Sequence, residues 1–108
     1  MELTDSKKGN FLIINLVGRL DTSNYGELEK KLLTFIENGE NHIVVDCSEM
    51  VYVSSSGLRV FLMALKKTTS TGGKLYLCAL QENIREIFEI AGFTSIFTIF
   101  NTQEEAVK

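Results

Sequence analysis

Three consecutive hydroxyl side chains, those of Ser54, Ser55 and Ser56, are the strongest candidates for chemistry in this 108-residue chain. With Gly57 they lie in residues 51–60, between an apolar run and the start of a run with helical periodicity. One hydroxyl is enough to cap a helix, and partners of open α/β sheets gather at the carboxyl ends of strands. The stretch therefore predicts an exposed turn where a phosphate could be added and sensed by another protein.

Serine hydrolysis is the first alternative use of these hydroxyls. A catalytic serine needs a histidine and an acid, and in α/β hydrolases it lies in a G-x-S-x-G turn. The chain has no such turn, and its single histidine, His42, is expected at the opposite end of the strand that leads to the serines. We expect His42 to be a surface residue of that strand, and we predict no catalytic residue.

Metal and nucleotide sites are the second alternative. Asp21 and Asp46 could hold Mg²⁺, but two isolated carboxylates are commonly capping or solvated residues. Cys47 and Cys78, with one histidine in the chain, cannot complete a zinc site, and we expect both to be buried free thiols. Gly72-Gly73 lacks the Walker lysine and precedes a strand, so it indicates the end of a helix. The sequence thus predicts no metal and no cofactor.

Composition limits the possible classes of protein. The chain is 44% hydrophobic and 23% charged, with a formal net charge of −3, so we expect one globular domain over residues 1–108. Its lysines and arginines form no cluster dense enough to follow a phosphate backbone, which disfavours nucleic-acid binding. No apolar run approaches about 18 residues, and the first residues lack a signal-peptide pattern. We expect a protein of the cytoplasm, monomeric when free and without membrane contact.

Apolar runs predict the strands and helices that position these residues. Strands are expected at residues 2–7, 10–17, 42–47, 74–78 and 95–100, the first two joined as a hairpin. The run at 42–47 is apolar on both faces at its centre, which is typical of an interior strand. The first helix is expected to begin at Asn24, with Glu27 as capping partner, and to end at Asn38-Gly39. Thr102 and Glu105 predict a capping box for a short last helix.

Helical periodicity also predicts which side chains point inward. The expected inward residues are Tyr25, Leu28, Leu32, Phe35 and Ile36 in the first helix, Leu58, Phe61, Leu62 and Leu65 in the second, and Ile84, Ile87, Phe88 and Ala91 in the third. Arg59 and Met63 are expected to point outward, Arg59 either as part of the partner surface or as an ordinary solvated charge. The order of elements is β-β-α-β-α-β-α-β-α, which requires right-handed crossovers. We therefore predict an α/β fold: a mixed, mostly parallel sheet with an N-terminal antiparallel hairpin, covered by about four helices.

An ordered set of short motifs resembles the STAS-domain anti-sigma factor antagonists over essentially the whole chain. The motifs that carry the resemblance are Gly18-Arg19-Leu20-Asp21, Asp46-Cys47-Ser48-Glu49-Met50, Tyr52-Val53-Ser54-Ser55-Ser56-Gly57-Leu58, Gly72-Gly73-Lys74-Leu75 and Ala91-Gly92-Phe93. Each motif is weak alone, but the set in this order and spacing is specific. The resemblance implies the STAS fold.

The resemblance also implies a function. In this family an anti-sigma factor, a histidine-kinase-like ATPase acting on serine, phosphorylates a loop serine; the unphosphorylated antagonist binds that kinase and frees a sigma factor, and a phosphatase resets the protein. Aligned on Gly57-Leu58, the acceptor is Ser55, with Ser56 as second candidate, and Ser54 replaces the usual acid. The partner-binding residues implied or expected beside it are Asp21, Thr22, Ser23, Ser54, Ser56, Gly57 and Arg59.

Two other functions remain open at this point. A STAS domain could serve as a scaffold subunit of a transporter or signalling assembly, in which case its binding would be indifferent to the serine. A small enzyme or nucleotide-binding protein of flavodoxin-like build is the third hypothesis, which hydrolase activity, or nucleotide binding lost on Asp21→Ala, would favour.

Overall fold

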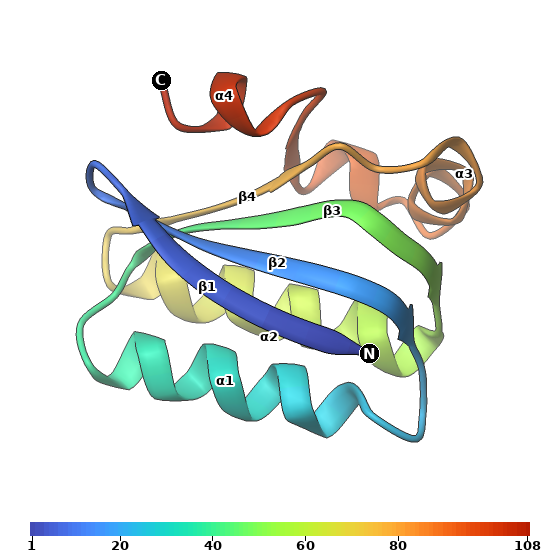
Figure 1. Cartoon of the computed structure of the whole chain (residues 1–108), viewed down its shortest axis with the longest axis horizontal. Helices are drawn as coiled ribbons and strands as arrows, with labels where there is room; N and C mark the ends of the chain where they lie inside the picture. The colour runs from blue at the N-terminus through green and yellow to red at the C-terminus, as the bar shows by residue number, and fades with distance from the viewer.

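A computed structural model describes all 108 residues (Figure 1). Its elements follow the predicted order, with one 3₁₀ turn, Phe93–Ser95, before the last strand. The strands are β1 (Glu2–Lys8), β2 (Phe11–Leu20), β3 (His42–Val53), β4 (Lys74–Cys78) and β5 (Thr98–Phe100). The helices are α1 (Tyr25–Glu37), α2 (Ser55–Ser70), α3 (Glu82–Ile90) and α4 (Gln103–Ala106). None of the helices is both long and apolar enough to cross a bilayer.

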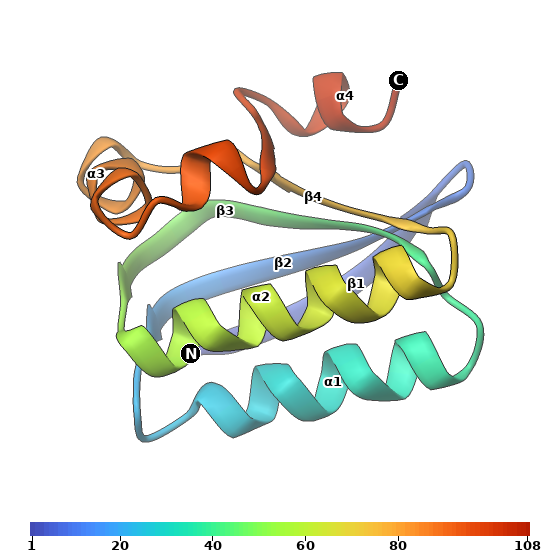
Figure 2. The same ribbon diagram turned by 180° about the vertical axis from the view of Figure 1, so that it is seen from behind.

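The five strands form one mixed sheet in the order β1-β2-β3-β4-β5. Strand β1 pairs antiparallel with β2, and all other neighbours are parallel. Helices α1 and α2 lie side by side on one face, α4 lies on the other, and α3 lies beyond the carboxyl end of β4 (Figures 1 and 2). The predicted mixed sheet with an antiparallel hairpin and four helices is confirmed.

Apolar burial on both faces of the sheet holds the helices in place. The larger cluster lies beneath α1 and α2 and includes Leu32 and Phe61, while the smaller one packs Ala106 of α4 against the other face. At the centre of β3, Ile43, Val44 and Val45 are all buried, as predicted for an interior strand. Cys47 and Cys78 are buried free thiols, which confirms that prediction too.

Strands β2 and β3 are longer than predicted. The break expected at Gly18 is a β-bulge: Gly18 has a φ of +99°, which favours glycine, and the strand continues to Leu20. Strand β3 likewise continues to Val53, so much of the predicted turn at residues 51–60 is strand and helix. Strand β5 is shorter than predicted because the Phe97 N–H bonds back to the Phe93 carbonyl in a tight turn.

Several inward-facing residues were assigned wrongly. Tyr25 and Ala91 are exposed. The buried face of α2 consists of Gly57, Val60, Phe61, Ala64 and Thr68. Leu62 and Met63 are both half-buried and line one surface groove, but only Met63, expected to face outward, also packs against the core. Gly57 and Ala64 on this buried face let α2 lie close to the sheet. A search for large apolar side chains therefore did not identify the buried face.

Candidate functional site

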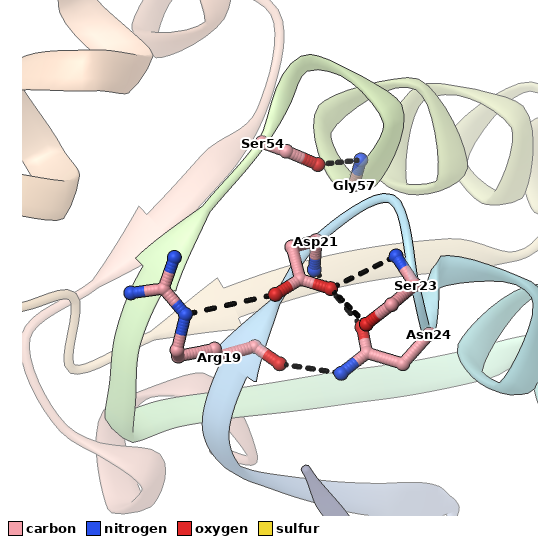
Figure 3. A network of polar contacts seen from close by, with 6 residues as sticks. All are labelled: Arg19, Asp21, Ser23, Asn24, Ser54 and Gly57. Atoms are coloured by element: carbon pink, nitrogen blue, oxygen red, sulfur yellow. Dashed lines mark hydrogen bonds and ion pairs between the residues drawn. The ribbon is translucent and has the colours of Figure 1, made fainter.

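The carboxyl ends of β2 and β3 lie side by side and bring two loops to one edge of the sheet. Leu20 is paired with Val53 at the end of the ladder, and the Ser54 N–H donates to the Leu20 carbonyl at 2.9 Å. The chain leaves β2 through residues 21–24 and leaves β3 directly into α2. Figure 3 shows Ser54 and Gly57 above Asp21 and Ser23 at this edge.

Ser54 is the N-cap of α2. Its backbone is extended, and its Oγ accepts a hydrogen bond from the Gly57 N–H at 3.2 Å. This bond satisfies one of the donors left free in the first turn of a helix. The half-buried Ser54 hydroxyl is used by the cap, so the hydroxyls of Ser55 and Ser56 are the ones that remain available in the serine run.

Ser55 and Ser56 lie inside the first turn of α2. The Ser55 side chain is exposed, that of Ser56 is half-buried, and neither hydroxyl takes part in a hydrogen bond within the chain. A capped helix start holds them on a defined backbone, so Ser55 presents a fixed, accessible hydroxyl at the edge of the sheet.

Gly57, expected in the partner surface, is instead buried against the sheet. A β-carbon at this position would lie 2.7 Å from the Leu20 Cγ and 3.0 Å from the Val53 Cγ2. A β-carbon essentially never lies less than 3.0 Å from such an atom, so the contact with Leu20 requires glycine where the first turn of α2 approaches the sheet. Gly57 therefore supports the surface by fixing where Ser55 lies.

Asp21 organises the neighbouring loop. Its Oδ1 accepts hydrogen bonds from the Ser23 N–H at 3.0 Å and the Ser23 Oγ at 2.6 Å. These bonds, together with the Arg19 guanidinium at 3.6 Å, lower the pKa of the Asp21 carboxyl below its usual value. Thr22 is exposed at the tip of the loop.

Asn24 is the N-cap residue of α1, but the predicted capping box with Glu27 is wrong. The Asn24 side chain turns back toward β2, where its Oδ1 accepts from the Asp21 N–H and its Nδ2 donates to the Arg19 carbonyl. Two local uses of this amide compete, a helix cap and a bridge to residues three and five positions earlier, and the bridge forms and ties the loop to the strand end.

Three residues at this edge were missed by the sequence reasoning. Arg19 lies over the ring of Tyr52 at 4.2 Å, a cation–π contact between β2 and β3. Val51 and Tyr52 remain 50% and 36% exposed, although they are large and apolar. The pairing register of β2 and β3 would have identified the first contact. Because both strands continue past the bulge, Arg19 and Tyr52 are paired directly across the two strands.

Comparison with known proteins decides the family. The family model of the STAS domain matches residues 3–106. BtrV of Bordetella bronchiseptica, provisionally named an anti-sigma factor antagonist, is 41% identical over 106 residues, which is 98% of this chain and 91% of BtrV. The chain belongs to the STAS domain family, among the anti-sigma factor antagonists.

Solved structures agree on the fold. A candidate anti-sigma factor antagonist of Thermotoga maritima superposes with a TM-score of 0.94 at 23% identity, over 97% of this chain and 91% of that protein. SpoIIAA of Bacillus, solved in its phosphorylated form, gives a TM-score of 0.78 at 21% identity, over 98% and 96% of the two chains.

The other polar residues considered for chemistry have structural positions in this STAS domain. His42 begins β3, at the opposite end from Ser54, and its ring packs edge-on against Phe11 at 5.7 Å. The Asp46 carboxylate accepts from the Ser48 N–H at 2.9 Å and from the Gln103 Nε2 of α4 at 2.8 Å. Asp46 thus anchors α4 to the sheet.

Proposed function

We propose that this anti-sigma factor antagonist binds a serine-kinase anti-sigma factor in its unphosphorylated form, so that a sigma factor is released, and is switched off by phosphorylation of Ser55. The observation that carries the proposal is the exposed Ser55 hydroxyl, free of hydrogen bonds, on a capped helix start. Ser56 is the second candidate acceptor. Its hydroxyl is also free of hydrogen bonds, but its side chain is half-buried and therefore less accessible than that of Ser55. The proposal places this chain in the cytoplasm, as a monomer when free.

The partner surface is the edge around Ser55. It includes the loop of Asp21, Thr22 and Ser23, whose backbone is held by the bonds to Asp21. Ser56 and the exposed Arg59 continue it along α2. Because the backbone of the loop and of the start of α2 is fixed before binding, little backbone entropy is lost when a partner docks.

Phosphorylation changes the charge of this surface without requiring a new fold. The kinase transfers the γ-phosphoryl group of ATP to the Ser55 Oγ, whose proton is lost, and ADP leaves. The phosphate carries about −1.5 to −2 charges, and the free N–H groups and dipole at the start of α2 favour a negative charge there. The bound kinase instead meets a hydrated dianion in a formerly neutral contact. A charge for which the partner offers no counter-ion costs an interface roughly 2–5 kcal/mol, which weakens binding about 30- to several-thousand-fold.

Ser54 fits this mechanism although most family members carry an acid at its position. Serine and aspartate are both good N-caps, so Ser54 keeps the backbone geometry that presents Ser55. Compared with an acid at the same position, Ser54 leaves one negative charge fewer beside the acceptor Ser55. A phosphatase that hydrolyses the phosphoserine would restore the binding-competent form.

The test is phosphorylation by the cognate anti-sigma factor kinase and ATP, with the modified residue located by mass spectrometry. We expect Ser55 to carry the phosphate, Ser55→Ala to abolish the modification, and Ser56→Ala to leave it. In binding assays Ser55→Ala should bind the kinase, whereas Ser55→Asp should not. Ser6→Asp, which adds the same charge on exposed β1, is the matched control and should bind normally. Equal affinity of Ser55→Ala and Ser55→Asp would favour a scaffold function independent of phosphorylation.

A further inference from the structure

Helix α2 concentrates positive charge in an acidic protein. Its sixteen residues include Arg59, Lys66 and Lys67 and no acid. The whole chain carries a formal charge of −3 and this helix +3, so the remaining residues carry −6. None of the three cations belongs to the chain's three ion pairs. The helix therefore offers unpaired positive charge on an otherwise negative surface.

Part of this charge shares one side of the helix with Ser55. Ser55, Arg59, Leu62 and Lys66 follow one another at intervals of four, three and four residues, which places them on one face of an α-helix. We call these four residues the α2 stripe. Arg59, Leu62 and Lys66 line a common surface groove of about 350 Å³, which confirms that they lie together. Figure 2 shows α2 beside α1 in the helical layer outside the sheet.

An apolar groove runs along the same side. Leu62, Leu65 and Ile96 line it together with Lys66, and its volume is about 670 Å³. Ile96 is 49% exposed, which is unusual for a large apolar side chain. This side of α2 therefore carries both cations, Arg59 and Lys66, and a groove that can accept apolar side chains.

We infer that the α2 stripe is a docking surface for an acidic amphipathic segment of the partner anti-sigma factor, with carboxylates on Arg59 and Lys66 and apolar side chains in the groove. The inference rests on the proposed function and names the chemistry of its partner. Nucleic acid and anionic membranes fit the surface less well. An extended polyanion would meet the −6 of the remaining chain, and it offers the groove few apolar groups.

Phosphorylation would act directly on this surface. Ser55 is the first residue of the stripe, and Arg59 follows it at i+4, the spacing at which opposite charges on a helix pair. A phosphate of about −1.5 to −2 charges on Ser55 offsets half to two-thirds of the helix's +3, and Arg59 is spaced to pair with it. Arg59 is then no longer available to the partner's carboxylates, which are repelled by the phosphate on Ser55.

The experiment measures the affinity of the cognate anti-sigma factor for the full chain and four variants by calorimetry. Lys66→Glu and Arg59→Glu should weaken binding by about tenfold or more, and the difference from wild type should shrink in about 1 M salt, where the Debye length is about 3 Å. Lys8→Glu, on the exposed β1 strand, is the charge-matched control and should stay within about twofold of wild type. Zero-length carboxyl–amine cross-linking should join Lys66 to glutamates or aspartates of one partner segment.

The fourth variant, Ser55→Asp, separates this inference from the proposed function. If Ser55→Asp loses binding but Lys66→Glu binds like wild type, the stripe is not a docking surface and the switch stands. Cross-links from Lys8 but not from Lys66 would overturn the inference in the same way, as would tighter binding of anionic vesicles or duplex DNA than of the anti-sigma factor. If wild type does not bind the anti-sigma factor, both proposals fall.

Discussion

The backbone of Gly57 lies directly against the side chain of Leu20, which joins the first turn of α2 to the end of β2. A β-carbon on Gly57 would stand 2.7 Å from the Leu20 Cγ. Gly57→Ala should therefore push the start of α2 away from the sheet and lower the free energy of unfolding by about 1–3 kcal/mol, the usual cost of overpacking. Urea unfolding measures this change.

Gly26→Ala is the matched control for that substitution. Gly26 lies in the first turn of α1, and a β-carbon there would meet nothing within 4 Å. The substitution should raise the free energy of unfolding by about 0.5–1 kcal/mol, because alanine loses less backbone entropy in a helix. Equal effects of the two substitutions would show that α2 does not depend on close contact with Leu20.

The Asp21 carboxyl should titrate below its usual range because Ser23 donates two hydrogen bonds to it. Ser23→Ala removes the hydroxyl donor, which is the largest cause of the lowered pKa, so it should raise the Asp21 pKa toward 3.8. Thr22→Ala, one residue earlier, should leave that pKa unchanged. Carboxyl carbon NMR during an acid titration measures both.

The lowered Asp21 pKa also has a consequence for stability. A carboxyl whose pKa is lower in the folded state stabilises the fold above its unfolded pKa, and this contribution is lost as the pH falls through the folded value. The difference in stability between wild type and Ser23→Ala should therefore narrow below about pH 4. A difference that widens on acidification would contradict the assignment.

Phosphoserine 55 should have a lowered second pKa because Arg59 lies one turn away on the same face of α2. The cation favours the dianionic form of the phosphate over the monoanionic form. In Arg59→Gln that pKa should rise toward about 6, the ordinary value. Phosphorus NMR of the phosphorylated protein measures it, with Lys8→Gln as control. An unchanged pKa in Arg59→Gln would mean that Arg59 does not pair with the phosphate.

The two buried thiols should make the fold sensitive to alkali. Burial raises the pKa of the Cys78 thiol to about 12 and that of Cys47 well above its ordinary value. The folded state therefore keeps protons that the unfolded chain releases, so stability should fall as the pH rises from about 9 toward 12. Cys78→Ala removes one such thiol, and its free energy of unfolding should fall less steeply over this range. A steeper fall would contradict the assignment.

Much of the fold could be predicted because its signals are local. Three apolar residues in a row identified β3 as an interior strand, and Thr102 with Glu105 identified the cap of α4, where the Glu105 N–H donates to the Thr102 hydroxyl at 3.2 Å. The serine run indicated the candidate site because three hydroxyls exceed what one cap requires. These patterns depend on neighbours in the sequence, which a sequence displays directly.

Most of the errors arose where distant parts of the chain decide the structure. Gly18 looked like a strand end, but pairing with β3 carries β2 past the bulge to Leu20. Asn24 looked like a side-chain cap, but its amide instead joins Arg19 to Asp21. The buried face of α2 follows the small residues that fit the sheet, so Met63 packs against the core although it also lines a surface groove with Leu62. The errors at Gly18 and in α2 depend on contacts between elements, whereas the Asn24 bonds are local and reflect a choice between two partners that the sequence offers equally.

The central claim is that one phosphate on Ser55 turns off binding while the fold is kept. The most direct measurement is the affinity of the cognate anti-sigma factor for unmodified protein and for protein phosphorylated stoichiometrically at Ser55. The account predicts a loss of at least about 30-fold, with superimposable circular dichroism spectra. Equal affinity of the two forms, or a phosphorylated form that has unfolded, would contradict it.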